Sequence, residues 1–400
     1  MGQTGLMKDK SAILLRSVAI GALLLLVPLA AGTTIAKGPL ISLSETAASA
    51  QVGSGNQMSD SKMMMPNPFT YVYVAGDSLS EEGGSGDVFE LQLTGDPELI
   101  LQNVAAALGI KGEIVEPEYS NAEYPAYVIG SIDGTGPSAT INWSGTGGWW
   151  FSNPSAYPPA ACAKMESAED GTQYCGAYEE QKPTPELLPS KAEMISQAVK
   201  LFSATGLKVS PADIETSLSE WGASACASLK IGGQDSPIEW TISWGSNGKI
   251  GTVSGQSVKA VNRGSYETIS DKAAVARMSD WRYSGQLPQS AWAKYQTPPS
   301  AGMIAYDGAV KAEPPVDQPT DGVSPEPAPE TVPEPSPSTV TVSVNKAIKS
   351  QLMIWDKAGK PWIVPGVMLF SKEGWITPVF TLKDGIVELP DPVEISPMVK

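Results

Sequence analysis

The chain has 400 residues, with 27 basic side chains, 43 acidic ones and a net charge of −16, which disfavours contact with nucleic acid. It contains no histidine. That absence excludes Ser-His-Asp and Cys-His nucleophile pairs and His-ligated zinc. We therefore expect a non-enzymatic protein that uses no cofactor and no metal.

The first hydrophobic segment, residues 17–35, carries no charge and is interrupted only by Pro28. A helix of this length, at about 1.5 Å per residue, can cross the hydrocarbon core of a membrane. Basic residues precede it, which predicts a cytoplasmic tail at residues 1–16 and an extracytoplasmic C-terminal bulk held at the cell membrane. The alternative is a signal peptide cleaved near Ala31 or Ala36, which would give a secreted protein.

Two similar modules are predicted after a flexible stalk at residues 36–67, which lacks apolar periodicity. The modules occupy residues 68–183 and 184–305. Each carries a helix with a glycine stop and then a Trp-bearing hairpin. The matching segments ALGIKG and ATGLKV lie 97 residues apart, and INWSGTGG and ISWGSNGK lie 101 residues apart. We interpret this pattern as a duplicated α+β unit.

Capping residues mark the predicted helix boundaries, because their side chains satisfy free backbone groups at helix ends. The signals are Asp96 and Pro97 at the start and Gly109 at the end of the first helix, Ser190, Glu193 and Gly206 for the second, and Ser270 for a third.

A Pro/Glu-rich linker is predicted at residues 306–338, since nine prolines and six acidic residues between 313 and 338 cannot form a core. Residues 339–400 alternate short apolar runs with turns and predict a small antiparallel β unit. The predicted fold class is α+β: an N-terminal single transmembrane helix, two duplicated helix-plus-antiparallel-sheet modules, the Pro-rich linker and the C-terminal β unit.

Of the three cysteines, Cys162 and Cys175 are predicted to form a disulfide, which an oxidising compartment would permit. Cys226 is left over. In the predicted strand, Cys226 lies on the same face as Ser224 and Ser228, and this face is polar. Three interpretations of Cys226 therefore remain open: an exposed thiol, an intermolecular disulfide, or a small, partly buried residue.

The segment GDSL at residues 76–79 resembles the first block of GDSL-type esterases, in which the serine is the nucleophile. The other blocks of that family are missing, so Ser78 is expected to be an ordinary loop residue. Pairs of acidic residues could serve a carboxylate-based hydrolase, but solvated loop charge is the simpler interpretation. These pairs are Glu81/Glu82, Glu116/Glu118 and Glu179/Glu180.

Two adjacent tryptophans, Trp149 and Trp150, lie in a glycine-rich segment. If the backbone is extended there, neighbouring side chains point to opposite faces and cannot both enter one core. We therefore nominate Trp149 and Trp150 as partner-binding residues, one of which is exposed and able to stack on a sugar ring or a protein.

The unit of a short helix, a glycine stop, a Trp-bearing strand, an SNGK-type turn and a return strand resembles the PepSY-type module of exported bacterial proteins. The segments at 76–93 and 355–370 are similar to uncharacterised membrane-anchored proteins of actinobacteria. The resemblance implies inhibition or sensing of a partner. We expect a membrane-anchored extracytoplasmic protein that binds an envelope protein or peptide. The alternatives are a cell-wall glycan-binding module and a carboxylate-based hydrolase.

Overall fold

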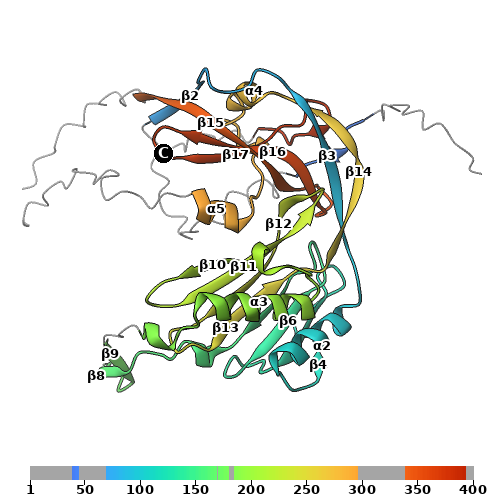
Figure 1. Ribbon diagram of the computed structural model, residues 1–400. Coiled ribbons are helices and arrows are strands. Elements are labelled where there is room, and N and C mark those ends of the chain that lie inside the picture. The colour runs from blue at the N-terminus through green and yellow to red at the C-terminus, as the bar shows by residue number, and fades with distance from the viewer. Residues whose placement is uncertain (1–37, 45–68, 169, 180–183, 296–337, 393–400) are drawn as a thin grey trace, which may run out of the picture. The chain divides into compact units, whose positions relative to one another are not determined.

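The protein is built mainly from β-strands. A computed structural model describes residues 38–44, 69–168, 170–179, 184–295 and 338–392 (Figure 1). Strands make up 45% of it and helices 17%, and the helices are short. The predicted α+β class is therefore wrong. The two longest helices pack on one of the two large sheets, and the other large sheet has no long helix.

The first large sheet has eight strands, all antiparallel to their neighbours. Their order is β10 (Glu215–Leu218), β11 (Ala223–Ile231), β12 (Gln234–Trp244), β13 (Ile250–Gly255), β7 (Trp149–Ser152), β6 (Ser138–Asn142), β5 (Ala126–Gly130) and β4 (Ile114–Val115). A helix followed by four strands thus occurs twice in the chain, and the two sets of strands join at β13 and β7 into one continuous sheet.

Two helices, α2 (Pro97–Leu108) and α3 (Lys191–Ala204), pack on one face of this sheet (Figure 1). Their predicted caps are confirmed. The Asp96 side chain accepts a hydrogen bond from the Leu99 backbone, and Gly109 ends α2 with a φ of 72°. Ser190 and Glu193 form the capping box of α3. Because these ends are satisfied locally, the helices begin where the sequence predicts.

The eight-stranded sheet is strongly two-sided. Side chains under the helices are apolar, such as Ile141, Val253 and Ile242, and form one core cluster with residues of α2 and α3. The opposite face carries mainly hydroxyl, amide and carboxylate side chains. Antiparallel strands commonly alternate in this way when only one face of a sheet is buried in a core.

The second large sheet combines strands from both ends of the chain. Its order is β14 (Val258–Thr268), β3 (Gly84–Leu93), β16 (Pro361–Ser371), β15 (Ser338–Trp355) and β2 (Phe69–Ala75), with β17 (Ile376–Phe380) paired to β16. β2 runs parallel to β15, while the other pairs are antiparallel. The sheets therefore cross the predicted boundaries between residues 68–183, 184–305 and 339–400, and the described residues fall in one compact unit.

Several strands are longer than the sequence predicts. Glycines are typical of loops, but β3 already begins at Gly84, within the glycine-rich segment that follows GDSL. Two of the short strands expected in the C-terminal unit are a single strand, β15. Polar residues such as Lys346 and Lys349 interrupt the apolar pattern there without ending the strand. Both side chains are exposed, although they point to opposite faces.

The remaining elements are small. Part of the predicted stalk is ordered, because β1 (Ile41–Ser42) pairs with β18 (Val387–Glu388). The others are β8 (Cys162–Ser167), β9 (Gln173–Tyr178), α4 (Asp271–Val275), α5 (Gln289–Tyr295) and the 3-10 turns Pro154–Ala156, Pro185–Leu187, Pro211–Asp213 and Trp281–Tyr283.

The transmembrane helix predicted at residues 17–35 lies outside the described residues, as does most of the predicted linker at 306–338. Within the part of the chain that the structure describes, no helix combines the length and the apolar character needed to span a membrane. The prediction of a single-pass membrane protein is therefore not supported by the structure, and we withdraw it together with the localisation derived from it.

Candidate functional site

A cleft of about 900 Å³ opens on the polar face of the eight-stranded sheet. We call it the Trp150 cleft. Strands β6, β7, β12 and β13 form its floor, and loops from elsewhere in the chain form its rim. Its lining residues are Ser44, Glu123, Tyr124, Asn142, Ser144, Gly145, Thr146, Gly148, Trp149, Trp150, Glu239, Ser254, Gly255, Gln256, Trp355, Asp356, Lys357, Ala358 and Gly359.

Trp150 stands in a row of side chains that crosses the floor of this cleft. Strand register places Thr140 and Ser254 on either side of it, and Thr241 is the next residue in the row. The Thr241 and Ser254 hydroxyl oxygens lie 2.8 Å apart and share a hydrogen bond. Of this row, the Trp150 ring and the Ser254 hydroxyl line the cleft, while Thr140 is buried.

The two nominated tryptophans have opposite environments. Trp150 is 41% exposed, whereas Trp149 is 1% exposed and packs in the core under the helices. A Cβ added at Gly255 would lie 2.4 Å from Trp240 Nε1 and 2.5 Å from Trp149 Cζ2. Both indoles thus cover a strand position that only glycine can occupy. Of the pair, only Trp150 is available to a ligand.

A second aromatic side chain, Trp355, lies on the rim. A Cβ at Gly145, whose φ is 58°, would come within 2.9 Å of the Trp355 ring, so the ring packs directly on that glycine. Tyr124 is a further exposed aromatic residue of the rim. A hydrogen bond with the Glu123 carboxylate raises the pKa of Tyr124. The cleft thus offers aromatic surfaces at its floor and at its rim.

Two of the carboxylates that line the cleft already accept hydrogen bonds from other groups of the protein. Glu239 is buried and accepts hydrogen bonds from the Gln289 backbone at 2.7 Å, the Ser290 backbone at 3.2 Å and the Ser228 hydroxyl at 3.2 Å. Asp356 accepts backbone hydrogen bonds within its own turn, from Ala358 and Lys360. These hydrogen bonds hold the floor and the rim in place.

Cys226 lies on the same sheet face, opposite Thr241 on the neighbouring strand. Burial, with the nearby carboxylates of Glu239 and Glu215 as lesser causes, raises the pKa of the Cys226 thiol to about 12. A thiol with such a pKa stays protonated at neutral pH and is a poor nucleophile. Of the interpretations left open, the small, partly buried residue is the one that the structure shows.

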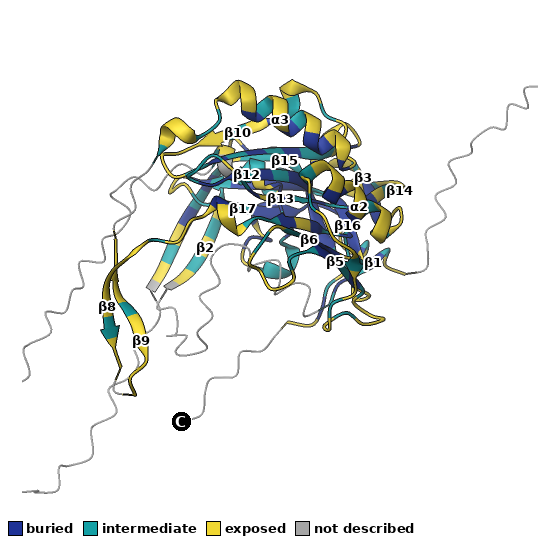
Figure 2. Cartoon of the chain, turned by 90° about the horizontal axis from the view of Figure 1, so that it is seen from below, coloured by how far each residue is buried: buried dark blue, intermediate teal, exposed yellow. Residues whose placement is uncertain are grey.

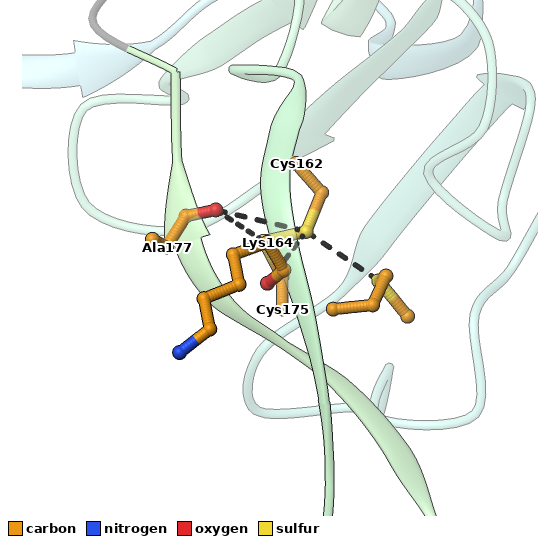
Figure 3. The surroundings of a disulfide bond; sticks show 5 residues. Cys162, Lys164, Cys175 and Ala177 are labelled. Carbon is orange, nitrogen blue, oxygen red and sulfur yellow. Dashed lines mark hydrogen bonds between the residues drawn. A yellow bond between two sulfur atoms is a disulfide. The ribbon is translucent and has the colours of Figure 1, made fainter.

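The predicted disulfide between Cys162 and Cys175 is confirmed, with the two Cα atoms 5.7 Å apart. It joins β8 and β9 in a two-stranded hairpin (Figure 3), where the Ala177 carbonyl oxygen lies 2.9 Å from Cys175 Sγ. Nearly every residue of this hairpin is exposed (Figure 2). Since an isolated two-stranded hairpin is marginally stable in water, the cross-link stabilises an otherwise weak projection.

The other motifs form no site among the described residues. The Ser78 hydroxyl donates to the Asn345 backbone carbonyl in the turn after β2, so it is held by a strand rather than by a catalytic base. Glu81 forms an ion pair with Lys272 at 2.6 Å on the surface. In the residues described, no group of three or more Asp, Glu, Cys or His side chains could hold a metal ion.

Sequence reasoning missed most of the cleft. It singled out the two tryptophans but not Asn142, Ser254 or Trp355. The signal was present in the alternation of SATIN, TVS (residues 252–254) and EWTISW, where every second residue is polar. Such alternation predicts a polar sheet face. The rim could not be found in this way, because Trp355 comes from a distant strand.

Comparison with known proteins adds no functional assignment. No protein-family model and no curated protein matches the chain. A crystal structure of an uncharacterized protein from Eubacterium rectale matches with 7% sequence identity and a TM-score of 0.37, covering 81% of this chain and 90% of that one. A TM-score this low carries no argument, so the resemblance to PepSY-type and actinobacterial proteins stays a prediction.

Proposed function

We propose that this is a non-enzymatic binding protein whose Trp150 cleft takes a saccharide. The observation that carries the proposal is the place of Trp150, an exposed indole in the middle of a hydroxyl-lined cleft floor. A sugar ring has apolar C–H faces that stack on an indole, and hydroxyl edges that hydrogen-bond to polar side chains.

The polar groups around Trp150 suit this ligand class. Asn142 supplies an amide, and Ser144, Ser254 and Thr146 supply hydroxyl groups that both donate and accept hydrogen bonds. With Glu239 and Asp356 committed to backbone groups, the proposal includes binding without turnover.

The test is retention on glycan by the Trp150→Ala protein. We expect the wild-type protein to bind one member of a panel of insoluble peptidoglycan and soluble oligosaccharides, and Trp150→Ala to bind it at least about tenfold more weakly, a loss of about 1.4 kcal/mol. Trp221→Ala is the matched control, because Trp221 is 48% exposed but lies outside the cleft.

Two outcomes would contradict the proposal. One is a wild-type protein that retains no glycan at any concentration tested. The other is equal retention by the wild-type and Trp150→Ala proteins. Release of new reducing ends from a bound glycan would instead point to the carboxylate-based hydrolase.

A second candidate function is protein binding by the β8–β9 hairpin. Met165, Tyr174 and Tyr178 are all exposed on it. Tyr178 pairs with Cys162 and Tyr174 with Glu166 on β8, and Tyr and Met are enriched at protein interfaces. The disulfide pre-organises this surface, which lowers the entropy lost on binding. This is the observation that favours the expected protein or peptide partner.

We expect a protein captured from an extract of the native host to be lost when both Tyr174 and Tyr178 are replaced by serine. Those changes leave the disulfide intact. Tyr119→Ser serves as the control, since Tyr119 is equally exposed but lies in the loop before β5. If the double variant captures the same protein as the wild type, the hairpin is not the contact surface. That result would leave the saccharide proposal unchanged.

A further inference from the structure

The two large sheets have five outer strands, which differ in how well their free edges are protected. β17 is five residues long and contains Pro378. β4 and β10 are only two and four residues long. β14 carries Lys259, Arg263 and Glu267, and its ladder is broken by an irregularity near Asn262. Short length, charge and bulges are the devices by which proteins prevent edge-to-edge pairing. β2 has none of them.

β2, with the sequence FTYVYVA, has seven residues and neither a charge nor a proline. Its one partner among the strands described is β15, on the inner side (Figure 1). Its residues alternate in exposure. Thr70, Val72 and Val74 are exposed on one face, while Tyr71 and Tyr73 are half-buried on the other. Tyr71 is fixed there by an edge-on contact with Trp375, at 5.2 Å between ring centroids.

We propose that β2 pairs antiparallel with β2 of a second copy of this chain, about a two-fold axis at Val72. In that register Val72 stands opposite Val72 of the partner subunit. Thr70 then faces Val74, and Tyr71 faces Tyr73, in both directions. Both residues of each of these pairs are β-branched or aromatic, the combinations that stabilise antiparallel strands most, and only the end pair, Phe69 with Ala75, includes a small side chain. The two strands supply each other's missing backbone hydrogen bonds, and the interface is isologous, as a two-fold dimer requires.

A second copy fits this edge better than a charged partner does. The protein as a whole has a net charge of −16, which opposes self-association through most of its surface. The exposed face of β2 has no charge, and its neighbours on β15 are Thr339, Thr341 and Ser343. Pairing at β2 therefore brings two acidic molecules together at a place where no like charges meet.

The experiment is sedimentation velocity of the full-length protein across the micromolar range, because an interface of one strand pair is at the small end of biological interfaces. We expect a reversible monomer–dimer equilibrium for the wild-type protein. Val72→Lys is expected to be monomeric throughout, since it sets two like charges opposite each other at the axis. Val72 is 45% exposed, so this change leaves folding intact, which circular dichroism checks.

Thr341→Lys is the matched control. Thr341 lies beside Val72 on the same face but on the inner strand β15, so this variant is expected to dimerise. A mixture of the Val72→Lys and Val72→Glu proteins should recover the dimer as a heterodimer, because opposite charges then meet at the axis. That rescue is specific to self-pairing at Val72.

A wild-type protein that stays monomeric at the highest concentration overturns the proposal, and indicates that some other segment or partner covers β2. Equal dimerisation by the wild-type and Val72→Lys proteins also overturns it, and would place the dimer interface elsewhere. Neither result bears on the Trp150 cleft, because Val72 and Thr341 are not among its lining residues.

Discussion

Replacing Trp149 with alanine is expected to lower the free energy of unfolding by about 4 kcal/mol, the usual cost of deleting a fully buried large aromatic side chain. Trp149 is packed against Gly255 and the apolar residues beneath α2 and α3. Its indole nitrogen has no hydrogen-bond acceptor among the described residues, so the loss comes from packing alone. Urea denaturation should show a lower midpoint with an unchanged m value.

Trp150→Ala is the control for this prediction, since the two residues are adjacent in sequence and differ in exposure. We expect Trp150→Ala to change the free energy of unfolding by less than about 1 kcal/mol, as is usual for exposed positions. If both variants lost the same stability, the assignment of one tryptophan to the core and the other to the cleft would be wrong.

Replacing Arg277 with alanine is expected to cost about 3 kcal/mol, because it leaves buried acceptors unpaired. The buried Arg277 guanidinium donates to the Phe380 carbonyl at 3.0 Å, the Leu382 carbonyl at 2.9 Å and the Asp384 carboxylate at 2.7 Å. It also lies 4.3 Å from the centroid of the Tyr283 ring. This one side chain therefore fixes the region after α4 to the strand β17 and the turn that follows it.

Thermal unfolding followed by calorimetry is the measurement for Arg277→Ala. Because Arg277 joins residues of the predicted second module to the predicted C-terminal unit, the variant is expected to unfold in one transition at a lower temperature. Lys272→Ala is the control, since its ion pair with Glu81 lies on the surface, where solvent screens it and its contribution to stability is small. A separate early transition of residues 339–400 would show that the C-terminal unit is independent after all.

Local features of the fold could be predicted from the sequence because their causes are local. Asp96, Gly109 and the Ser190–Glu193 box act within a few residues, and the structure confirms them. The disulfide was predicted from spacing and was also confirmed. Strand partners were beyond reach, because the sequence near β2 carries no information that its neighbour is β15, at the other end of the chain.

In the candidate site, too, features with a local cause could be predicted from the sequence, and features that depend on packing could not. That Trp149 and Trp150 point to opposite faces could be argued from the pleat of a strand alone. Which of the two is buried depends on the side that α2 and α3 cover, and that is a property of packing. The contribution of Trp355 to the rim depends on a strand that joins another sheet, so no local pattern could reveal it.

The parallel pairing of β2 with β15 has a consequence for synthesis. The ribosome makes β2 and β3 early, yet their sheet partners β15 and β16 are among the last strands to emerge. Until then, the Val- and Tyr-rich strand β2 lacks β15, its one partner among the described strands. Contacts so distant along the chain are slow to form, and unpaired apolar strands are prone to aggregate. During synthesis, β2 therefore stays without its sheet partner until β15 has been made.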